Sequence, residues 1–301
     1  MRAIRKEALY GGRGMAALLL GPSLVLFVLF HVWPALDALW ISMCSWTGFA
    51  PQAEFVGLAN FTALAKDSRF RQALWNTLYY VLAGGLGHFF FAFLFAAALN
   101  NPRFAGRKFF QTLIFFPSFI AVVGTGILWS RLYSAKDGLI NQLLHLFGGE
   151  NVAWLSPDHA LNAGIASSIW AGVGSQMILL LAGMRRIPTE YYEAARLDGA
   201  GEWQLFRHIT LPMLKDVSYV ALALWLIGSM QVFGLVQALQ GPTIPLETET
   251  VSTYQYALSF NARNNIYLMG RGTAMAVVLV ALIVLMVGLL RLIFGKRELE
   301  Y

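Results

Sequence analysis

The residues best suited to chemistry lie in one polar stretch, residues 185–212, between two long apolar runs. Pro188 suits the first position of a helix, because its missing N–H costs nothing there. Glu193 follows within the first turns, where the helix dipole favours an acidic side chain. Gly199 suits the left-handed conformation that ends a helix. The stretch therefore predicts a helix, a turn and a second short helix at residues 203–208.

The first of these helices offers a surface suited to contact with another protein. Ala194 and Ala195 are small, so a partner can approach the helix closely, and Tyr191 and Leu197 supply apolar flanks. The residue types alone leave two alternatives open. The helix either lies on the membrane surface as an amphipathic segment, or it docks onto a partner protein.

The chain lacks groups that would supply energy for transport. Residues 295–296, Gly-Lys, are followed by Arg297 and lack the correctly spaced first glycine of a phosphate-cradling loop. Ion-coupled transporters usually carry acids or bases inside the bilayer, whereas the apolar runs contain only His31 and His88, with Arg291 close enough to an edge to snorkel. We therefore expect no catalytic residue, no metal site and no cofactor in this chain, and energy supplied by a partner.

A second set of candidate residues lies on polar faces of two apolar runs. Residues 3, 4 or 7 positions apart share one face of a helix. The candidates are Ser168, Gly172, Ser175 and Gln176 in one run, and Trp225, Ser229 and the neighbouring Gln231 in the next. Hydroxyl and amide groups replace the water that a polar solute loses in the membrane, and an aromatic ring stacks on a sugar. The alternative is close helix packing through small residues.

The polar stretch resembles the signature of permease subunits of ATP-driven (ABC) importers. That signature runs Glu-Ala-Ala, three residues, Gly, nine residues, Ile, one residue and Leu-Pro, and every spacing is matched here. The matching residues are Glu193, Ala194, Ala195, Gly199, Ile209, Leu211 and Pro212, and the match extends to Asp198, Ala200 and Phe206. In that family the stretch forms a coupling helix that inserts into a cleft on the ATPase subunit. The resemblance therefore implies that residues 188–212 couple this chain to an ATPase.

Other stretches are similar to the carbohydrate-uptake branch of these importers, the maltose and glycerol phosphate type. They are residues 55–61, Asn76-Thr77, Phe116-Pro117, Trp129 and residues 138–141, whereas residues 240–242 depart from the double glycine that often precedes the proline. The resemblance implies half of a translocation pathway for a sugar or oligosaccharide. It also implies a second homologous permease, two ATPase subunits that bind ATP and magnesium, and an extracytoplasmic solute-binding protein.

Two alternatives to sugar transport remain at this point. The first is an ABC permease for another polar solute, such as a glycerol phosphate or a polyol. A charged solute would favour basic residues along the path, and the apolar runs carry none at their centres. The second alternative is a membrane protein outside the ABC class.

The elements that position these residues are expected to be membrane helices. The mean hydropathy is +0.59 and 13% of the residues are charged, against about 25% in soluble domains. A membrane explains this composition better than a nucleic-acid partner does. Crossing a bilayer takes about 20 helical residues. The runs that qualify are residues 15–35, 77–99, 111–129, 163–184, 217–238 and 273–294.

The basic residues set an expected orientation for these runs. With both termini in the cytoplasm, the inner segments hold 15 of the 22 lysines and arginines, including those near Pro102, and the outer segments hold 7, including Arg263. Cytoplasmic loops carry such an excess. We therefore predict an all-α integral protein of the bacterial inner membrane, with six transmembrane helices and a type I importer permease fold. We also predict a single membrane domain over residues 1–301, with a cytoplasmic coupling loop at about 185–215.

Overall fold

The computed structural model describes Met15 and residues 18–101, 103–260 and 267–295. Several basic residues that contribute to the predicted orientation lie outside the described residues, namely those at positions 2–13, Arg263, Lys296 and Arg297, as does Pro102. The chain divides into two compact units, one of Met1–Lys66 with Leu258–Val278 and the other of Asp67–Ala257 with Leu279–Tyr301. The single membrane domain over residues 1–301 remains a prediction.

The first unit is built on an apolar helix, Leu18–Ser42, which includes a π-helical turn η1 (Val28–Val32) and ends as α2 (Trp33–Ser42). No residue in the most apolar part of this helix is buried. Two short antiparallel strands, β1 (Cys44–Ser45) and β2 (Glu54–Phe55), and α3 (Ala59–Lys66) follow. The Asn60 amide donates hydrogen bonds to the Ser42 and Cys44 carbonyls, both at 2.9 Å, and so fixes the turn after α2.

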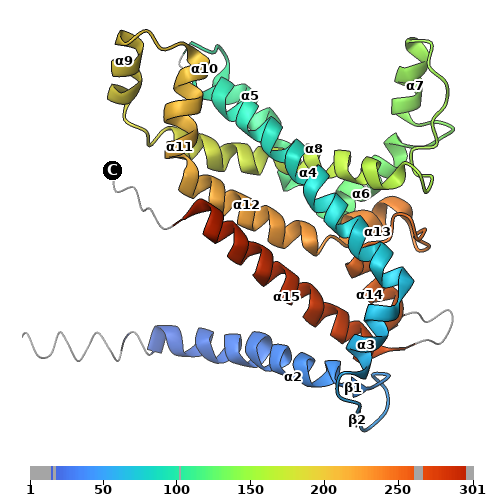
Figure 1. The fold of residues 1–301 in the computed structure, drawn as a ribbon. Helices are drawn as coiled ribbons and strands as arrows, with labels where there is room; N and C mark the ends of the chain where they lie inside the picture. The colour runs from blue at the N-terminus through green and yellow to red at the C-terminus, as the bar shows by residue number, and fades with distance from the viewer. Residues whose placement is uncertain (1–14, 16–17, 102, 261–266, 296–301) are drawn as a thin grey trace, which may run out of the picture. The chain divides into compact units, whose positions relative to one another are not determined.

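Four described helices are long and apolar enough to cross a membrane alone. They are Leu18–Ser42, α4 (Ser68–Asn100), α8 (Ala160–Met184) and α15 (Met269–Phe294). The number is six if each of two bent helix pairs forms one span. The prediction of an all-helical membrane fold is thus confirmed. Within the second unit, α4 and α8 make the most extensive helix–helix contact (Figure 1).

The third predicted span, residues 111–129, is not a continuous helix. It consists of α5 (Arg107–Phe115) with the 3-10 turn η2 (Phe116–Phe119), followed by α6 (Val122–Leu132) after a bend of 99°. Pro117 lies in η2 and has no N–H to donate to a continuing helix. Ile120 and Ala121 then take extended backbone conformations, with ψ of 128° and 139°.

The fifth predicted span, residues 217–238, is also divided. Helix α12 (Lys215–Met230) ends before α13 (Gly234–Gln240) begins. The Ser229 hydroxyl donates to the Trp225 carbonyl at 2.7 Å near this end, and such back-bonding competes with helix geometry. Before α12 lie three short helical segments, α10 (Glu202–Leu205), the π-helical η3 (Phe206–Thr210) and α11 (Leu211–Met213), bent by 70° from α12.

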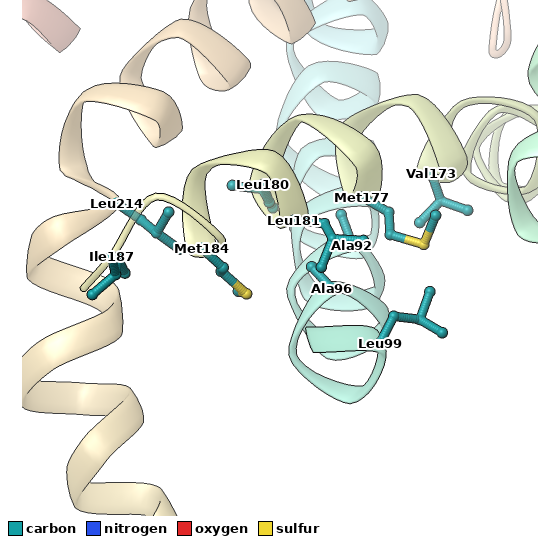
Figure 2. Packing of buried hydrophobic residues seen from close by; sticks show 10 residues of the cluster. All are labelled: Ala92, Ala96, Leu99, Val173, Met177, Leu180, Leu181, Met184, Ile187 and Leu214. Carbon is teal, nitrogen blue, oxygen red and sulfur yellow. The ribbon is translucent and has the colours of Figure 1, made fainter. Parts of the chain in front are cut away.

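The main apolar cluster lies where α4 meets the end of α8 (Figure 2). Ala92 and Ala96 sit one turn apart on α4, and such small side chains let membrane helices approach closely. The cluster consists of these two residues and Leu99, Val173, Met177, Leu180, Leu181, Met184, Ile187 and Leu214. The remaining helices of the described chain are α7 (Leu139–Leu146), α9 (Thr189–Leu197) and α14 (Val251–Phe260).

Candidate functional site

The predicted helix and turn of the polar stretch are present as α9 and the residues after it. Pro188 is the N-cap of α9, one position before its predicted place. Gly199 has φ of +83°, a left-handed conformation that L side chains rarely adopt. The Gly199 and Ala200 amides donate to the Arg196 and Ala195 carbonyls at 3.0 and 2.9 Å, which ends the helix. The second helix is longer than predicted, because α10 continues through η3 into α11.

Helix α9 is attached to the rest of the second unit along one side. Its Tyr192 packs against the apolar cluster, and the Tyr192 and Thr210 hydroxyls are 3.0 Å apart. Arg196 forms an exposed ion pair with Glu202 at 3.0 Å. None of the residues of α9 is fully buried. The helix is therefore held at a fixed position while most of its surface stays open to a partner.

Most of the predicted coupling residues line two hollows beside α9. A small hollow of about 310 Å³ is lined by Ala195, Asp198, Gly199, Ala200, Gln204, Leu205, His208 and Ile209. Glu193 and Leu211 line a much larger groove. Ala194 and Pro212 are exposed but line neither hollow. The fold thus gathers most of the predicted residues around the turn at Gly199.

The larger groove has a volume of about 1860 Å³ and connects the predicted pathway with the polar stretch. Its long walls come from α4, α12 and α15 and are apolar. One end reaches α9 and α10 and carries the charged residues Arg103, Arg107, Arg185, Glu193, Arg196 and Glu202. Trp225 lines the apolar part. A single groove therefore contains both Trp225 and Glu193.

The other predicted pathway residues do not line this groove. Three of them donate their hydroxyls to carbonyls of their own helix: Ser168 to Ile165, Ser175 to Gly172 and Ser229 to Trp225, each at 2.7 Å. The Gln231 amide donates to the Ile227 carbonyl at 3.2 Å. The buried Oε1 of Gln176 has no hydrogen-bond partner among the described residues.

Trp225 is fixed by contacts that the sequence did not reveal. Its indole N–H donates to the Val81 carbonyl at 3.1 Å. The imidazole of His88 packs against the indole, with 4.0 Å between the ring centroids. Gly84 and Gly85 of α4 face the same ring, and a Cβ at either position would approach it to 2.9 or 2.8 Å. The adjacent glycines in an apolar run were the available signal for this close approach.

At the start of α4, away from the end that packs in the apolar cluster, the structure shows a second group of contacts that the sequence did not predict. It joins residues about 180 positions apart in the chain. Glu249, with 3% of its side chain exposed, accepts two hydrogen bonds from Arg69, at 2.7 and 2.8 Å. The Asn76 amide donates to the Glu249 carbonyl at 2.9 Å. Tyr254 donates to Asp67 at 2.6 Å, and burial together with this bond raises the pKa of the phenol. We call Asp67, Arg69, Asn76, Glu249 and Tyr254 the clasp.

Metal binding has no support in the part of the chain that the structure describes. No group of three or more histidine, cysteine, aspartate or glutamate side chains is arranged to hold an ion there.

Comparisons with known proteins agree with the resemblance in the polar stretch. The family model described as "Binding-protein-dependent transport system inner membrane component" matches residues 88–298. The probable ABC transporter permease protein YurN of Bacillus subtilis (strain 168) is 36% identical over 289 residues, which is 94% of this chain and 96% of that protein. The sn-glycerol-3-phosphate transport system permease protein UgpA of Escherichia coli O6:K15:H31 (strain 536 / UPEC) is 31% identical, with 95% and 96% covered.

Solved structures show the same fold. A chain of a bacterial ABC transporter involved in the import of the acidic polysaccharide alginate aligns with a TM-score of 0.79 and 26% identity, covering 95% of this chain and 98% of that one. A chain of the bacterial alginate ABC transporter in complex with its pentasaccharide-bound periplasmic protein aligns with a TM-score of 0.78 and 25% identity, covering 99% of both. This chain thus belongs to the family of inner membrane permease components of binding-protein-dependent ABC importers.

Proposed function

We propose that this permease forms half of the translocation pathway for a sugar or oligosaccharide. A second homologous permease forms the other half, two ATPase subunits bind ATP and magnesium, and an extracytoplasmic binding protein delivers the solute. The observation that carries the proposal is the groove that contains both Trp225 and Glu193. Its apolar part suits a pathway wall, and its charged end adjoins the segment that resembles a coupling helix.

The exposure of α9 supports the coupling role. A helix of nine residues has little stability of its own in water. Here Tyr192 and the turn at Gly199 hold it in place, while Tyr191 and Leu197 expose apolar surface. An ATPase that receives this helix in a cleft would cover that surface. The small hollow beside Gly199 gives the partner room to approach the backbone.

The character of the groove supports a solute without strong charge. The residues around Trp225 in the groove are apolar, and its charged side chains lie at the end next to α9. The relative UgpA is named for sn-glycerol 3-phosphate, YurN is named for no solute, and the structural neighbours are named for alginate, an acidic polysaccharide. An aromatic ring in an uncharged wall matches the apolar face of a sugar ring, so we favour a neutral or weakly charged sugar.

The coupling role is tested by Glu193→Lys in the complete importer reconstituted in lipid vesicles. Disrupting a buried, hydrogen-bonded charge pair at an interface costs about 2–5 kcal/mol, and each 1.4 kcal/mol is about tenfold in affinity. We expect at least a tenfold loss of copurified ATPase or of solute-stimulated ATP hydrolysis, with normal membrane insertion. Glu150→Lys, in an exposed segment before α8, is the matched control. Wild-type coupling in Glu193→Lys would refute the role.

The solute class is tested separately, with the binding protein of the same transport system. Vesicles containing the importer receive that protein together with neutral oligosaccharides or with glycerol 3-phosphate. We expect a neutral sugar to stimulate ATP hydrolysis and uptake. Stimulation by glycerol 3-phosphate alone would reject the sugar assignment while leaving the coupling role intact.

A further inference from the structure

Helix α7 carries an apolar stripe that no described residue covers. Leu139, Leu143, Leu146 and the following Phe147 are 51%, 47%, 79% and 89% exposed. Their spacing of four, three and one positions places them on one face of the helix. We call these four residues the α7 stripe.

The side of α7 away from the stripe is hydrogen-bonded to the segment that follows the helix. The stripe therefore points away from that segment. Asn141 is 2% exposed, and its amide donates to the Val152 carbonyl at 3.0 Å. Its side-chain oxygen accepts from the Val152 amide at 3.2 Å and from the Trp154 indole at 2.9 Å. Ile140 packs against the small apolar cluster that contains Tyr133. These bonds hold α7 as a rigid element.

The chain connectivity places α7 at the end of α8 remote from α9. It lies between α6 and the start of α8, whereas α9 follows the end of α8. In Figure 1, α7 runs across the direction of α8 rather than along it. Because α8 is long and apolar enough to cross a membrane, a helix across its direction is oriented to lie along the membrane plane.

An aromatic cluster fixes α7 to the rest of the second unit. The Trp129 and Tyr133 ring centroids are 5.1 Å apart, and those of Tyr133 and Trp154 are 5.9 Å apart. Tyr133 is 5% exposed, and the Trp154 indole donates to the Asn141 side-chain oxygen, so this cluster holds α7 against the end of α6.

We propose that α7 is an interfacial anchor, whose stripe inserts into the bilayer surface on the side opposite to α9. The four residues of the stripe are leucine and phenylalanine, Gln142 lies at its edge, and His145 lies on the opposite face of the helix. Its exposed area is on the order of 500 Å², given the size of such side chains. A stable protein interface buries about 800 Å² on each partner. The stripe is too small for that but sufficient for a lipid surface.

Spin labels at single cysteines test the proposal in the complete importer, reconstituted in vesicles of phosphatidylethanolamine and phosphatidylglycerol. The only cysteine, Cys44, is buried and is replaced by Cys44→Ala. Labels are placed at Leu146→Cys and Phe147→Cys, with His145→Cys on the opposite, exposed face of α7 as the control. Both positions of the stripe are highly exposed, and retained ATP-dependent uptake confirms an intact complex. Leu143→Cys replaces a variant that fails this check.

The measurement is the collision rate of each label with oxygen, which enters lipid, and with a water-soluble nickel chelate. We expect the ratio of oxygen to chelate collisions at the stripe to exceed that at position 145 at least fivefold, because labels on the stripe lie in lipid. Equal ratios at the three positions would place the stripe in water and overturn the proposal. An immobile label shielded from both reagents would place it against a protein, the binding protein or the second permease, and would overturn the proposal as well.

Discussion

Trp225 is the predicted pathway residue that the structure places in the groove, and it differs in this respect from its predicted neighbours. We expect Trp225→Ala to lower uptake at least tenfold, because it removes the ring from the wall. Trp225→Phe keeps an aromatic face and should retain more uptake.

Ser175→Ala is the matched control for this substitution. Ser175 was predicted to face the pathway, but its hydroxyl donates to the Gly172 carbonyl of its own helix. Its loss should therefore leave uptake within about twofold of the wild type, since a surface side chain rarely matters more. Transport assays over a range of solute concentrations provide the measurement. An equal loss in Ser175→Ala would mean that the path runs along α8.

The close packing of α4 against Trp225 leads to a second prediction. In Gly85→Ala the new Cβ would lie 2.8 Å from the indole nitrogen, so the ring must move or the helices must separate. Overpacking of this kind costs about 1–3 kcal/mol. We expect a lower unfolding temperature and reduced uptake.

Gly228→Ala is the control for this effect, because nothing lies within 4 Å of a Cβ at that position of α12. It should leave the unfolding temperature unchanged or raise it, since alanine favours a helix over glycine. Unfolding of the detergent-solubilised importer measures both variants. Equal stability of the two would contradict a tight fit around Trp225.

At the scale of elements, the turn after α9 depends on one backbone conformation. Gly199→Ala would strain the left-handed turn by about 1–2 kcal/mol, although the site has room for the methyl group. We expect weaker ATPase docking, and Gly199→Asn should recover part of it because asparagine tolerates this conformation. Gly148→Ala carries the same strain, at φ of +76°, far along the chain from α9. If it impaired docking equally, general strain would explain the result.

The clasp predicts an asymmetry between its two charged partners. Arg69 is 47% exposed and can be hydrated when its partner is removed, whereas Glu249 is 3% exposed and cannot. An unpaired buried charge costs about 3–5 kcal/mol. We therefore expect Arg69→Ala to destabilise the protein more than Glu249→Gln does. Thermal unfolding and limited proteolysis near residues 241–250 provide the measurement. If Glu249→Gln destabilised the protein more than Arg69→Ala, Arg69 would contribute little to its stability.

The elements also show what a sequence can predict. Apolar runs and the Glu-Ala-Ala spacing identified the membrane class and α9, because both are local patterns. The breaks after Phe119 and Met230 were missed, since hydropathy does not distinguish a straight span from a bent pair. The clasp was missed because Arg69 and Glu249 are paired only by the fold. The same limit applies to the pathway: a helical face shows which residues align, but not whether the face borders the groove.

For the whole molecule, the remaining prediction is its orientation. Both termini should be cytoplasmic, so that α9 faces the cytoplasm and the segment after α6 faces outward. In a Cys44→Ala background, Lys136→Cys should react with a membrane-impermeant maleimide in intact cells. Asp198→Cys should react only after the cells are opened. Labelling of Asp198→Cys in intact cells would reverse the predicted orientation. As a control, both cysteine variants should react after the cells are opened, which shows that each position is accessible to the reagent.

The helix Leu18–Ser42 and the groove have a consequence for how the cell makes this protein. No residue in the most apolar part of the helix is buried, and the long walls of the groove are apolar. Lipid can cover the apolar helix, but a subunit made without the proposed second permease would leave the groove uncovered. We expect such an orphan subunit to be recognised and degraded by membrane proteases. If the proposed second permease exists, balanced synthesis of both chains is needed to obtain either one, and coexpression is the practical route to this protein.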